Sequence, residues 1–282
     1  MAVASQAGVA SGGASRAGGP VIDIRHLTLS FDEKVILRDV SFTLDRGHTK
    51  IILGASGSGK STILKLILGL LHPDGGEIWI NGERTDTMRE FEMMRARADL
   101  GMVFQEGALF DSLAVGENVG YKLYEESELP ADAVRRRVDE VLGFMGLQEH
   151  VDKMPSALSG GQRRRVAIAR AMASKPSILL YDEATTGLDP ITAITVDQEM
   201  VKLRDLEGVA SIIVTHQLRD AFWVAEKMAV RGPDGKVQIL PASPEKLGQT
   251  EFVMLREGLI AFEGTAGELR ATNDPYLQLF LS

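Results

Sequence analysis

The segment Gly54-Ala55-Ser56-Gly57-Ser58-Gly59-Lys60-Ser61 is the most informative part of the sequence, because it matches the phosphate-loop pattern G-x-x-x-x-G-K-[ST] in full. An apolar run, IIL, precedes it and a strongly apolar segment, ILKLILGLL, follows. Glycines let several backbone N–H groups converge on a phosphate without side-chain clashes, and a helix N-terminus attracts anions. The pattern therefore predicts a strand, a phosphate-binding loop and a helix that begins near Lys60, rather than a glycine-rich turn without function.

The chemistry of this loop indicates ATP and Mg²⁺ as ligands. We expect Lys60 to reach the β- and γ-phosphates and the Ser61 hydroxyl to ligate Mg²⁺. The nucleotide-binding residues predicted here are Gly54, Ala55, Ser56, Gly57, Ser58, Gly59, Lys60, Ser61 and Thr62.

A second apolar run, SILLYDE, ends in two carboxylates. Charge at the edge of a buried sheet is costly unless a cation or substrate meets it. We expect Asp182 to serve Mg²⁺ and Glu183 to polarise an attacking water. The alternative is an acidic pair exposed to solvent. A third run, ASIIVTH, ends in His216, and both runs are typical of buried parallel strands with chemistry at their carboxyl ends.

Composition narrows the class of protein. Hydrophobic residues make up 44% of the 282 residues and charged residues 25%, as in a globular protein with a substantial core. The net charge of -8 argues against a nucleic-acid partner. The sequence contains no cysteine, which excludes disulfides, thiolate metal sites and cysteine nucleophiles.

The remaining patterns predict an α/β domain over residues 20–282. It has a mostly parallel core sheet, antiparallel strands near the N-terminus with a turn at Asn81-Gly82, and a helical subdomain at about 88–170. One predicted helix carries its apolar residues on one face: Val134, Val138, Val141 and Leu142. Residues 1–19, rich in Ala, Gly and Ser, are expected to form a flexible tail rather than a targeting segment. No apolar stretch is long enough to span a bilayer, so we expect a soluble chain that meets a membrane through a partner.

The segment Leu158-Ser159-Gly160-Gly161-Gln162 lies between the phosphate loop and the acidic strand. A serine followed by two glycines at a helix start favours anion binding, although a serine there is also an ordinary N-cap. In this order and spacing, LSGGQ resembles the signature of the ABC ATPases. The resemblance covers about residues 21–282. It implies that Ser159, Gly160, Gly161 and Gln162 contact ATP across a head-to-tail dimer of two copies.

The same resemblance implies roles for four further positions. Phe31 matches the aromatic residue that stacks on adenine, although a lone Phe in a strand more often belongs to a core. Gln105 resembles the Q-loop glutamine, which serves Mg²⁺ or the attacking water. Gly187-Leu188-Asp189 resembles the D-loop, and His216 resembles the switch histidine that contacts the γ-phosphate. The predicted catalytic set is thus Glu183, His216 and Gln105, and the predicted metal set is Ser61, Gln105 and Asp182.

The chain departs from the family pattern in two places. Ala184 follows the catalytic glutamate where the family usually has proline, which bears on the rigidity of that loop. Residues 231–250 lengthen a hairpin that is usually short, and their glycine, proline and polar content predicts a surface loop.

Three stretches, at the Q-loop, after the catalytic glutamate and near the C-terminus, resemble the ATPases of the Mla and Mce lipid-transport systems. These stretches are QEGALFDSL from Gln105, TTGLDPITA from Thr185 and NDPYLQLF from Asn273. The resemblance implies lipid movement between bacterial inner and outer membranes, permease partners in the membrane, an Mce-type lipid-binding subunit, and a peripheral place on the cytoplasmic face of the inner membrane. Two alternatives stay open: an ABC ATPase for another solute such as amino acids, and a non-transport ABC ATPase acting on nucleic acid or the ribosome.

The resemblance also implies a groove beside the Q-loop that receives a short helix of the permease. We expect this groove to be lined by Ala108, Leu109, Phe110 and Leu113. The alternative is a small satellite core beneath the helical subdomain.

Overall fold

The structure is a computed structural model that describes residues 19–126 and 128–281, so the expected tail lies, apart from Gly19, outside the described residues. The strands are β1 (Ile22–Phe31), β2 (Lys34–Leu44), β3 (Thr49–Gly54), β4 (Gly75–Ile80), β5 (Glu83–Arg84), β6 (Leu100–Val103), β7 (Ile178–Asp182), β8 (Ala210–Val214), β9 (Lys227–Arg231), β10 (Val237–Pro241), β11 (Thr250–Arg256) and β12 (Leu259–Thr265). The α-helices are α1 (Lys60–Ile67), α2 (Glu90–Ala98), α3 (Val115–Glu126), α4 (Ala131–Phe144), α5 (Gly160–Ala173), α6 (Pro190–Glu207), α7 (Leu218–Glu226), α8 (Pro244–Leu247), α9 (Ala266–Arg270) and α10 (Pro275–Leu281). Two short 3₁₀ helices cover Gln148–His150 and Pro155–Ala157.

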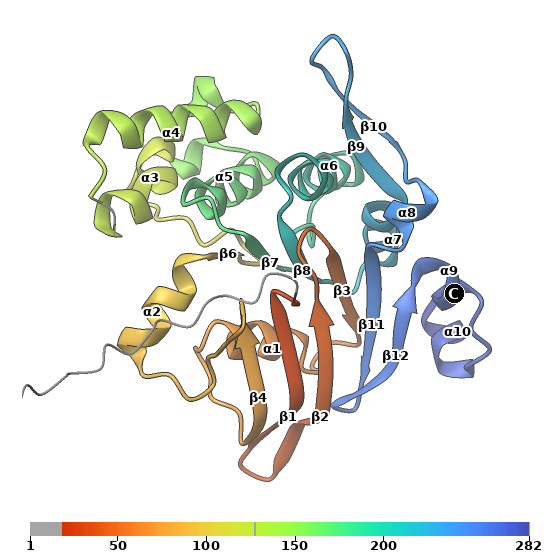
Figure 1. Ribbon diagram of the computed structural model, residues 1–282. Coiled ribbons are helices and arrows are strands. Elements are labelled where there is room, and N and C mark those ends of the chain that lie inside the picture. Colours follow the sequence, from red (N-terminus) through yellow and green to blue (C-terminus); the bar gives the residue numbers. More distant parts are fainter. Residues whose placement is uncertain (1–18, 127, 282) are drawn as a thin grey trace, which may run out of the picture.

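A six-stranded sheet of order β12-β11-β3-β8-β7-β6 forms the centre of the fold (Figure 1). Its strands are parallel except β12, which pairs antiparallel with β11. Strand β3 is buried along its whole length, and its side chains alternate between two cores. Ile51 and Leu53 belong to one core and Ile52 to the other. Burial on both faces explains the apolar runs within the central strands.

The helices divide between the two faces of this sheet. Helix α1 packs in the core shared with the four-stranded sheet, of order β2-β1-β4-β5. Helices α3 to α7 contribute to the opposite core (Figure 1). The predicted apolar face of α4 is confirmed, because the buried residues of that helix are Val134, Val138, Val141 and Leu142. The α/β fold predicted from the sequence is confirmed.

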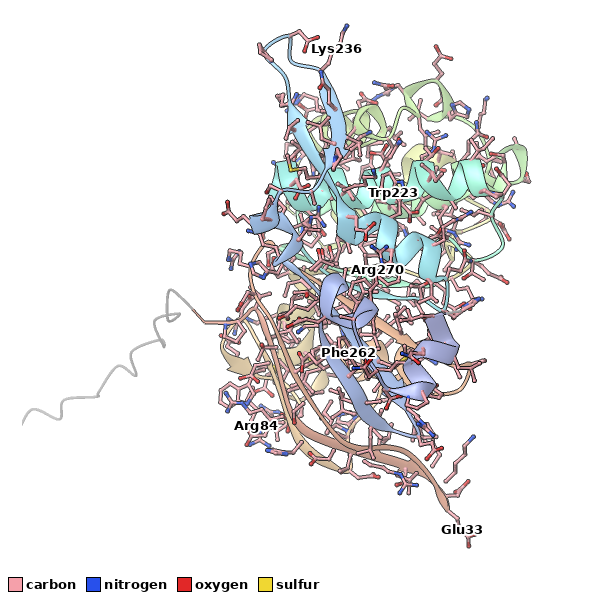
Figure 2. The ribbon with its side chains drawn as sticks, turned by 90° about the vertical axis from the view of Figure 1, so that its right-hand side faces the viewer. Glu33, Arg84, Trp223, Lys236, Phe262 and Arg270 are labelled. Atoms are coloured by element: carbon pink, nitrogen blue, oxygen red, sulfur yellow. The ribbon has the colours of Figure 1, made fainter. Side chains whose placement is uncertain are left out.

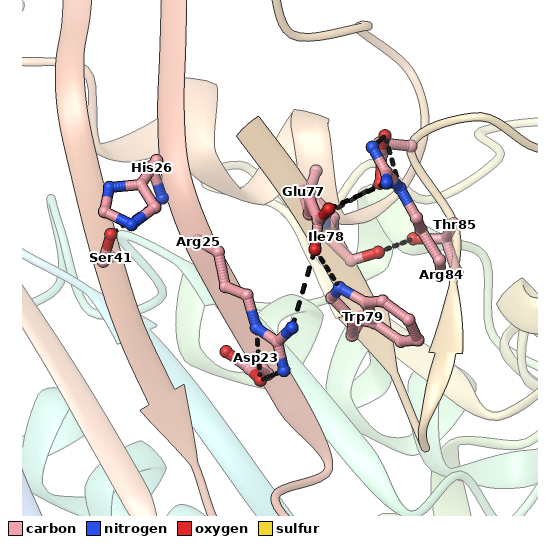
Figure 3. Close-up of polar contacts among 10 residues, drawn as sticks. Asp23, Arg25, His26, Ser41, Glu77, Ile78, Trp79, Arg84 and Thr85 are labelled. Carbon is pink, nitrogen blue, oxygen red and sulfur yellow. Dashed lines mark hydrogen bonds and ion pairs between the residues drawn. The ribbon is translucent and has the colours of Figure 1, made fainter. Parts of the chain in front are cut away.

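The four-stranded antiparallel sheet turns one face to the core and the other to solvent. On the outer face, Arg25 of β1 pairs with Asp23 and Glu77, and Glu77 also pairs with Arg84 (Figure 3). Strands β4 and β5 meet at Asn81-Gly82, where both residues have positive φ, 49° and 81°. This is the geometry of a type I′ turn and confirms the predicted hairpin.

The lengthened segment 231–250 belongs to a hairpin at the surface, as expected, but it is not the loop that its composition predicts. Strands β9 and β10 form a two-stranded antiparallel sheet, and the short helix α8 follows. Figure 2 shows Lys236 at the tip of this hairpin and Glu33 at the opposite end of the molecule. Gly232, Pro233 and Gly235 form the turn, but Val237 and Ile239 pack against the main core, and this alternation favours a strand. Within the described residues, no helix is long and apolar enough to cross a membrane.

Candidate functional site

The phosphate loop connects β3 to α1, as the sequence predicts. Gly54, Gly57 and Gly59 have φ angles of 153°, 78° and 103°, which side-chain-bearing residues rarely adopt. A Cβ at Gly54 would lie 2.6 Å from the carbonyl oxygen of Leu255, and one at Gly59 would lie 2.9 Å from a methyl group of Leu37. Glycine is therefore required at Gly54 and Gly59 by both conformation and space.

Lys60 is the first residue of α1, and its ammonium lies inside the loop. Its Nζ donates to the carbonyl oxygens of Gly54, at 2.9 Å, and Ala55, at 3.0 Å. Burial lowers the pKa of Lys60, and the carboxylates of Glu183 and Asp182 oppose that shift. The loop thus concentrates a cation and a helix N-terminus at one point, which suits a polyphosphate.

The two oxygen ligands predicted for Mg²⁺ are brought together. The Ser61 hydroxyl donates to Oδ1 of Asp182 at 2.7 Å, although 121 positions separate them in the chain. Burial raises the pKa of Asp182, the hydrogen bond from Ser61 opposes this shift, and the nearby Glu183 adds to it. A buried carboxylate whose charged form is disfavoured gains from a hard cation, and hydroxyl and carboxylate oxygens are the ligands Mg²⁺ prefers. The pair therefore fits this ion.

Glu183 and His216 form a second pair at the same sheet edge. His216 Nδ1 lies 3.0 Å from Glu183 Oε1, and the Thr186 hydroxyl donates to Oε2 at 3.1 Å. An ionised carboxylate only accepts hydrogen bonds, so this contact assigns the proton to Nδ1 and leaves Nε2 for a ligand. Glu183 has a φ of 48°, an uncommon conformation for a residue with a side chain. Its amide donates to the Val214 carbonyl at 2.9 Å, which holds this backbone in place.

Two other predicted residues stand apart from these pairs. Gln105 follows β6 and is exposed; the register of β6 against β7, with Val103 opposite Tyr181, puts it on the edge that carries Glu183. None of the hydrogen bonds described for residues 19–126 and 128–281 joins Gln105 to Ser61 or Asp182. Phe31 ends β1 and is 46% exposed, so the alternative that it belongs to a core is wrong. Its stacking on adenine stays a prediction.

The signature segment begins helix α5 and carries a complete capping box. Ser159 Oγ accepts from the Gln162 amide at 3.3 Å, and Gln162 Oε1 accepts from the Ser159 amide at 2.9 Å. The ordinary N-cap considered for Ser159 is therefore present. A Cβ at Gly161 would lie 2.0 Å from Cγ2 of Thr192 on α6, whereas one at Gly160 would meet nothing closer than 3.5 Å. Gly161 lets α5 approach α6, and Gly160 has no such packing role.

Sequence reasoning missed three residues that contact these motifs. His150 Nε2 lies 3.0 Å from the side-chain nitrogen of Gln162. Arg164 donates to the carbonyl oxygens of Phe104 and Thr186, and Arg170 donates to those of Gly107 and Ala108. No local pattern identifies them, because each partner lies in another part of the chain.

An apolar groove of about 330 Å³ lies beside the Q-loop. It is formed by β6, the segment after it, α3 and α5, and its lining is Leu100, Gly101, Met102, Phe104, Ala108, Phe110, Tyr121, Lys122, Glu126, Arg170, Ala171 and Ser174. Of the four residues expected there, Ala108 and Phe110 are present. Leu109 and Leu113 are not part of the lining, and Leu109 packs against the main core instead.

Comparison with known proteins places this site in a family. The family model described as "ABC transporter" matches residues 37–186, which include the phosphate loop, the signature and the acidic strand. The chain belongs to the ABC transporter family. Fold and family together establish it as an ABC ATPase that binds and hydrolyses ATP.

Individual ABC proteins are similar over most of the chain. The Protein TRIGALACTOSYLDIACYLGLYCEROL 3, chloroplastic, of Arabidopsis thaliana is 36% identical over 92% of this chain and 73% of its own length. The intermembrane phospholipid transport system ATP-binding protein MlaF of Escherichia coli K12 is 34% identical over 89% of this chain and 95% of its own. The methionine import ATP-binding protein MetN of Leifsonia xyli is 41% identical, and the alignment covers 74% of this chain and 62% of MetN. A solved structure of the dimeric ABC cassette MJ0796, in a post-hydrolysis state with ADP and phosphate, superposes with a TM-score of 0.70. It is 30% identical in sequence, and the superposition covers 86% of this chain and 98% of the MJ0796 chain.

Proposed function

We propose that this ATPase drives the movement of phospholipid or a related lipid between the inner and outer membranes of a bacterium. It would act at the cytoplasmic face of the inner membrane, bound to integral permease subunits, with an Mce-type lipid-binding subunit as a further candidate partner. The observation that carries the lipid assignment is the similarity to MlaF, which extends over 95% of that protein and thus beyond the ATP motifs.

The geometry supports a separate role for each group of site residues toward the nucleotide. Lys60 and the loop amides would bind the phosphates, and Ser61, Asp182 and Gln105 would hold Mg²⁺, which neutralises phosphate charge when bound. Glu183 would accept a proton from the attacking water, with its carboxylate fixed by Thr186 and His216. The free Nε2 of His216 would meet the γ-phosphate.

The positions of the two ATP motifs support the proposed head-to-tail dimer. Helix α1 follows the phosphate loop, and helix α5 begins within the signature. The two helices pack in cores on opposite faces of the central sheet. The signature would therefore complete the site of a second copy rather than its own. MJ0796, the similar cassette, is dimeric. Closing and reopening of this pair would be passed to the permease.

The groove beside the Q-loop is the proposed docking site for the permease. Phe110 is 41% exposed, stacks on Tyr121 with ring centroids 4.6 Å apart, and has the guanidinium of Arg170 5.9 Å from its ring centroid. Exposed aromatic side chains in an apolar groove suit a short amphipathic helix. The groove opens to the surface, which argues against the satellite core considered from the sequence.

The test is Phe110→Asp, with Phe91→Asp as the matched control. Phe91 is 78% exposed on α2 and lies outside the groove lining. We expect Phe110→Asp to bind ATP normally, to lose co-purification of the permease and to stop lipid movement, while Phe91→Asp retains both. A stable complex with Phe110→Asp would refute the docking site.

The similarity to MetN supports a second candidate function, which is the import of a small solute such as an amino acid. Purifying the membrane complex and analysing its lipid by mass spectrometry separates the two. Specifically bound lipid supports the first proposal. An amino-acid-transporting complex without lipid would overturn the lipid assignment and leave the ATPase assignment intact.

A further inference from the structure

Arg164 lies two residues after the signature segment, in the second turn of α5, and reaches both loops that carry the proposed catalytic residues. It is on α5 and only 7% exposed. Its Nη1 donates to the carbonyl oxygen of Phe104 at 3.1 Å, and its Nη2 donates to that of Thr186 at 3.3 Å. Phe104 directly precedes Gln105, and Thr186 is three residues after Glu183. One guanidinium thus connects the Q-loop to the turn after the acidic strand.

The Thr186 end of this bridge leads directly to the proposed base. The Thr186 amide donates to the carbonyl oxygen of Glu183 at 3.1 Å, and its hydroxyl donates to Glu183 Oε2 at 3.1 Å. A shift of the Thr186 backbone therefore changes the hydrogen bond that orients this carboxylate. At the other end, the Phe104 carbonyl also accepts from the Gly107 amide at 2.8 Å, so Arg164 holds the closed turn in which Gln105 lies.

The electrostatics of Arg164 match a bridging role. Burial lowers its pKa, and the negative charge of Glu106 on the Q-loop opposes this shift. An arginine stays charged even so, and its planar fork holds two acceptors at a fixed separation. Lysine offers a single ammonium and cannot fix two carbonyl groups in the same way.

We propose that Arg164 is a positioning residue for ATP hydrolysis: it holds the loops of Gln105 and Glu183 at a fixed separation and links both to the signature helix. This inference rests on the proposed roles of Gln105 and Glu183. Because α5 begins at the signature, a displacement of this helix on nucleotide binding in the partner's site would be passed through Arg164 to the chain's own catalytic loops.

The neighbouring Arg165 provides a matched control. It lies on the same helix, is half-buried, and its Nη1 also donates to a backbone carbonyl, that of Met145, at 2.9 Å. That carbonyl follows α4 and belongs to neither catalytic loop. The two arginines thus share helix and hydrogen-bond chemistry, and they differ in what they hold.

The experiment compares Arg164→Lys and Arg165→Lys in the purified full chain, with kcat, KM for ATP, nucleotide affinity and thermal unfolding measured for each. For Arg164→Lys we expect kcat to fall ~10- to 100-fold, because small displacements of catalytic groups cost this much. KM and nucleotide affinity should stay within about threefold and the unfolding temperature near that of the wild type. Arg165→Lys should retain its kcat. A kcat within twofold of wild type in folded Arg164→Lys would overturn the inference.

A double variant separates positioning from general damage. If Arg164 acts through Thr186, then Arg164→Lys combined with Thr186→Ala should lower kcat by less than the product of the two single effects. A fully multiplicative loss would overturn the route through Thr186. Should Arg164→Lys fail to fold, Arg164→Gln serves in its place, because it keeps an amide donor without the buried charge. The same limits on kcat then support or overturn the inference.

Glu183→Gln, measured in parallel, distinguishes failure of this inference from failure of the proposed function. Normal turnover in Glu183→Gln would remove the proposed base itself. Lost turnover in Glu183→Gln with normal turnover in Arg164→Lys would refute only the positioning role.

Discussion

Replacing Gly161 by alanine tests the packing that the signature imposes inside one chain. The new Cβ would lie 2.0 Å from Cγ2 of Thr192, far inside the ~3.5–4.0 Å at which carbon atoms make favourable contact. Thr192 cannot rotate away freely, because its hydroxyl donates to the Asp189 carboxylate and its amide donates to Asp189 Oδ1 at 3.1 Å. Either α5 moves away from α6 or the cap of α6 is broken.

Overpacking of this kind costs about 1–3 kcal/mol of unfolding free energy. The gain in helix propensity from glycine to alanine is at most about 1 kcal/mol. Gly160→Ala is the matched control, because its Cβ would make only an ordinary 3.5 Å contact with Leu188. For a chain of this size we expect Gly161→Ala to unfold about 2–6 °C below Gly160→Ala.

The assay is thermal unfolding without nucleotide, so that effects on ATP binding do not enter. Thr192→Ser removes the clashing methyl group and keeps the hydroxyl that bonds Asp189. The double variant Gly161→Ala/Thr192→Ser should therefore regain most of the loss. Equal unfolding temperatures for the two alanine variants, or no recovery in the double variant, would refute the packing argument.

Three further predictions concern catalysis, assembly and pH. Glu183→Gln should still bind ATP but turn over ~10²- to 10⁴-fold more slowly, and near-normal ATPase activity would exclude Glu183 as the base. Ser58→Cys with Gly160→Cys should give a disulfide between two chains, more so with ATP, in a protein without native cysteine; a link only within one chain would contradict the head-to-tail dimer. Burial, with the nearby Asp220, raises the pKa of Asp197 to about 8, so the native state holds a proton that the unfolded chain releases above pH ~4. Stability should therefore fall as pH rises from ~4 to ~8. Asp197→Asn should remove this slope and be more stable at pH 8 by up to about 5 kcal/mol in urea unfolding, whereas an unchanged slope would assign it to another group.

The phosphate loop, the central strands and the apolar face of α4 could be predicted from the sequence. Each of these is a local property. The positive φ angles at Gly54 and Gly59 require glycine, and burial on both faces favours the apolar runs within the central strands. Composition predicted a loop for segment 231–250, but Gly232, Pro233 and Gly235 form only its turn, while Val237 and Ile239 pack on the core and Pro244 begins α8.

The tertiary structure alone decided which of these residues meet. Strand order brings Ser61 to Asp182 and Glu183 to His216, and no spacing in the chain encodes those distances. The signature gave no sign that Gly161 must accommodate Thr192 of another helix. Tyr121 of α3 lines the groove beside the Q-loop. Arg164 of α5 joins the Q-loop to the turn after Glu183. Such contacts depend on how helices and strands pack in three dimensions, and a local pattern carries no information about its distant neighbour.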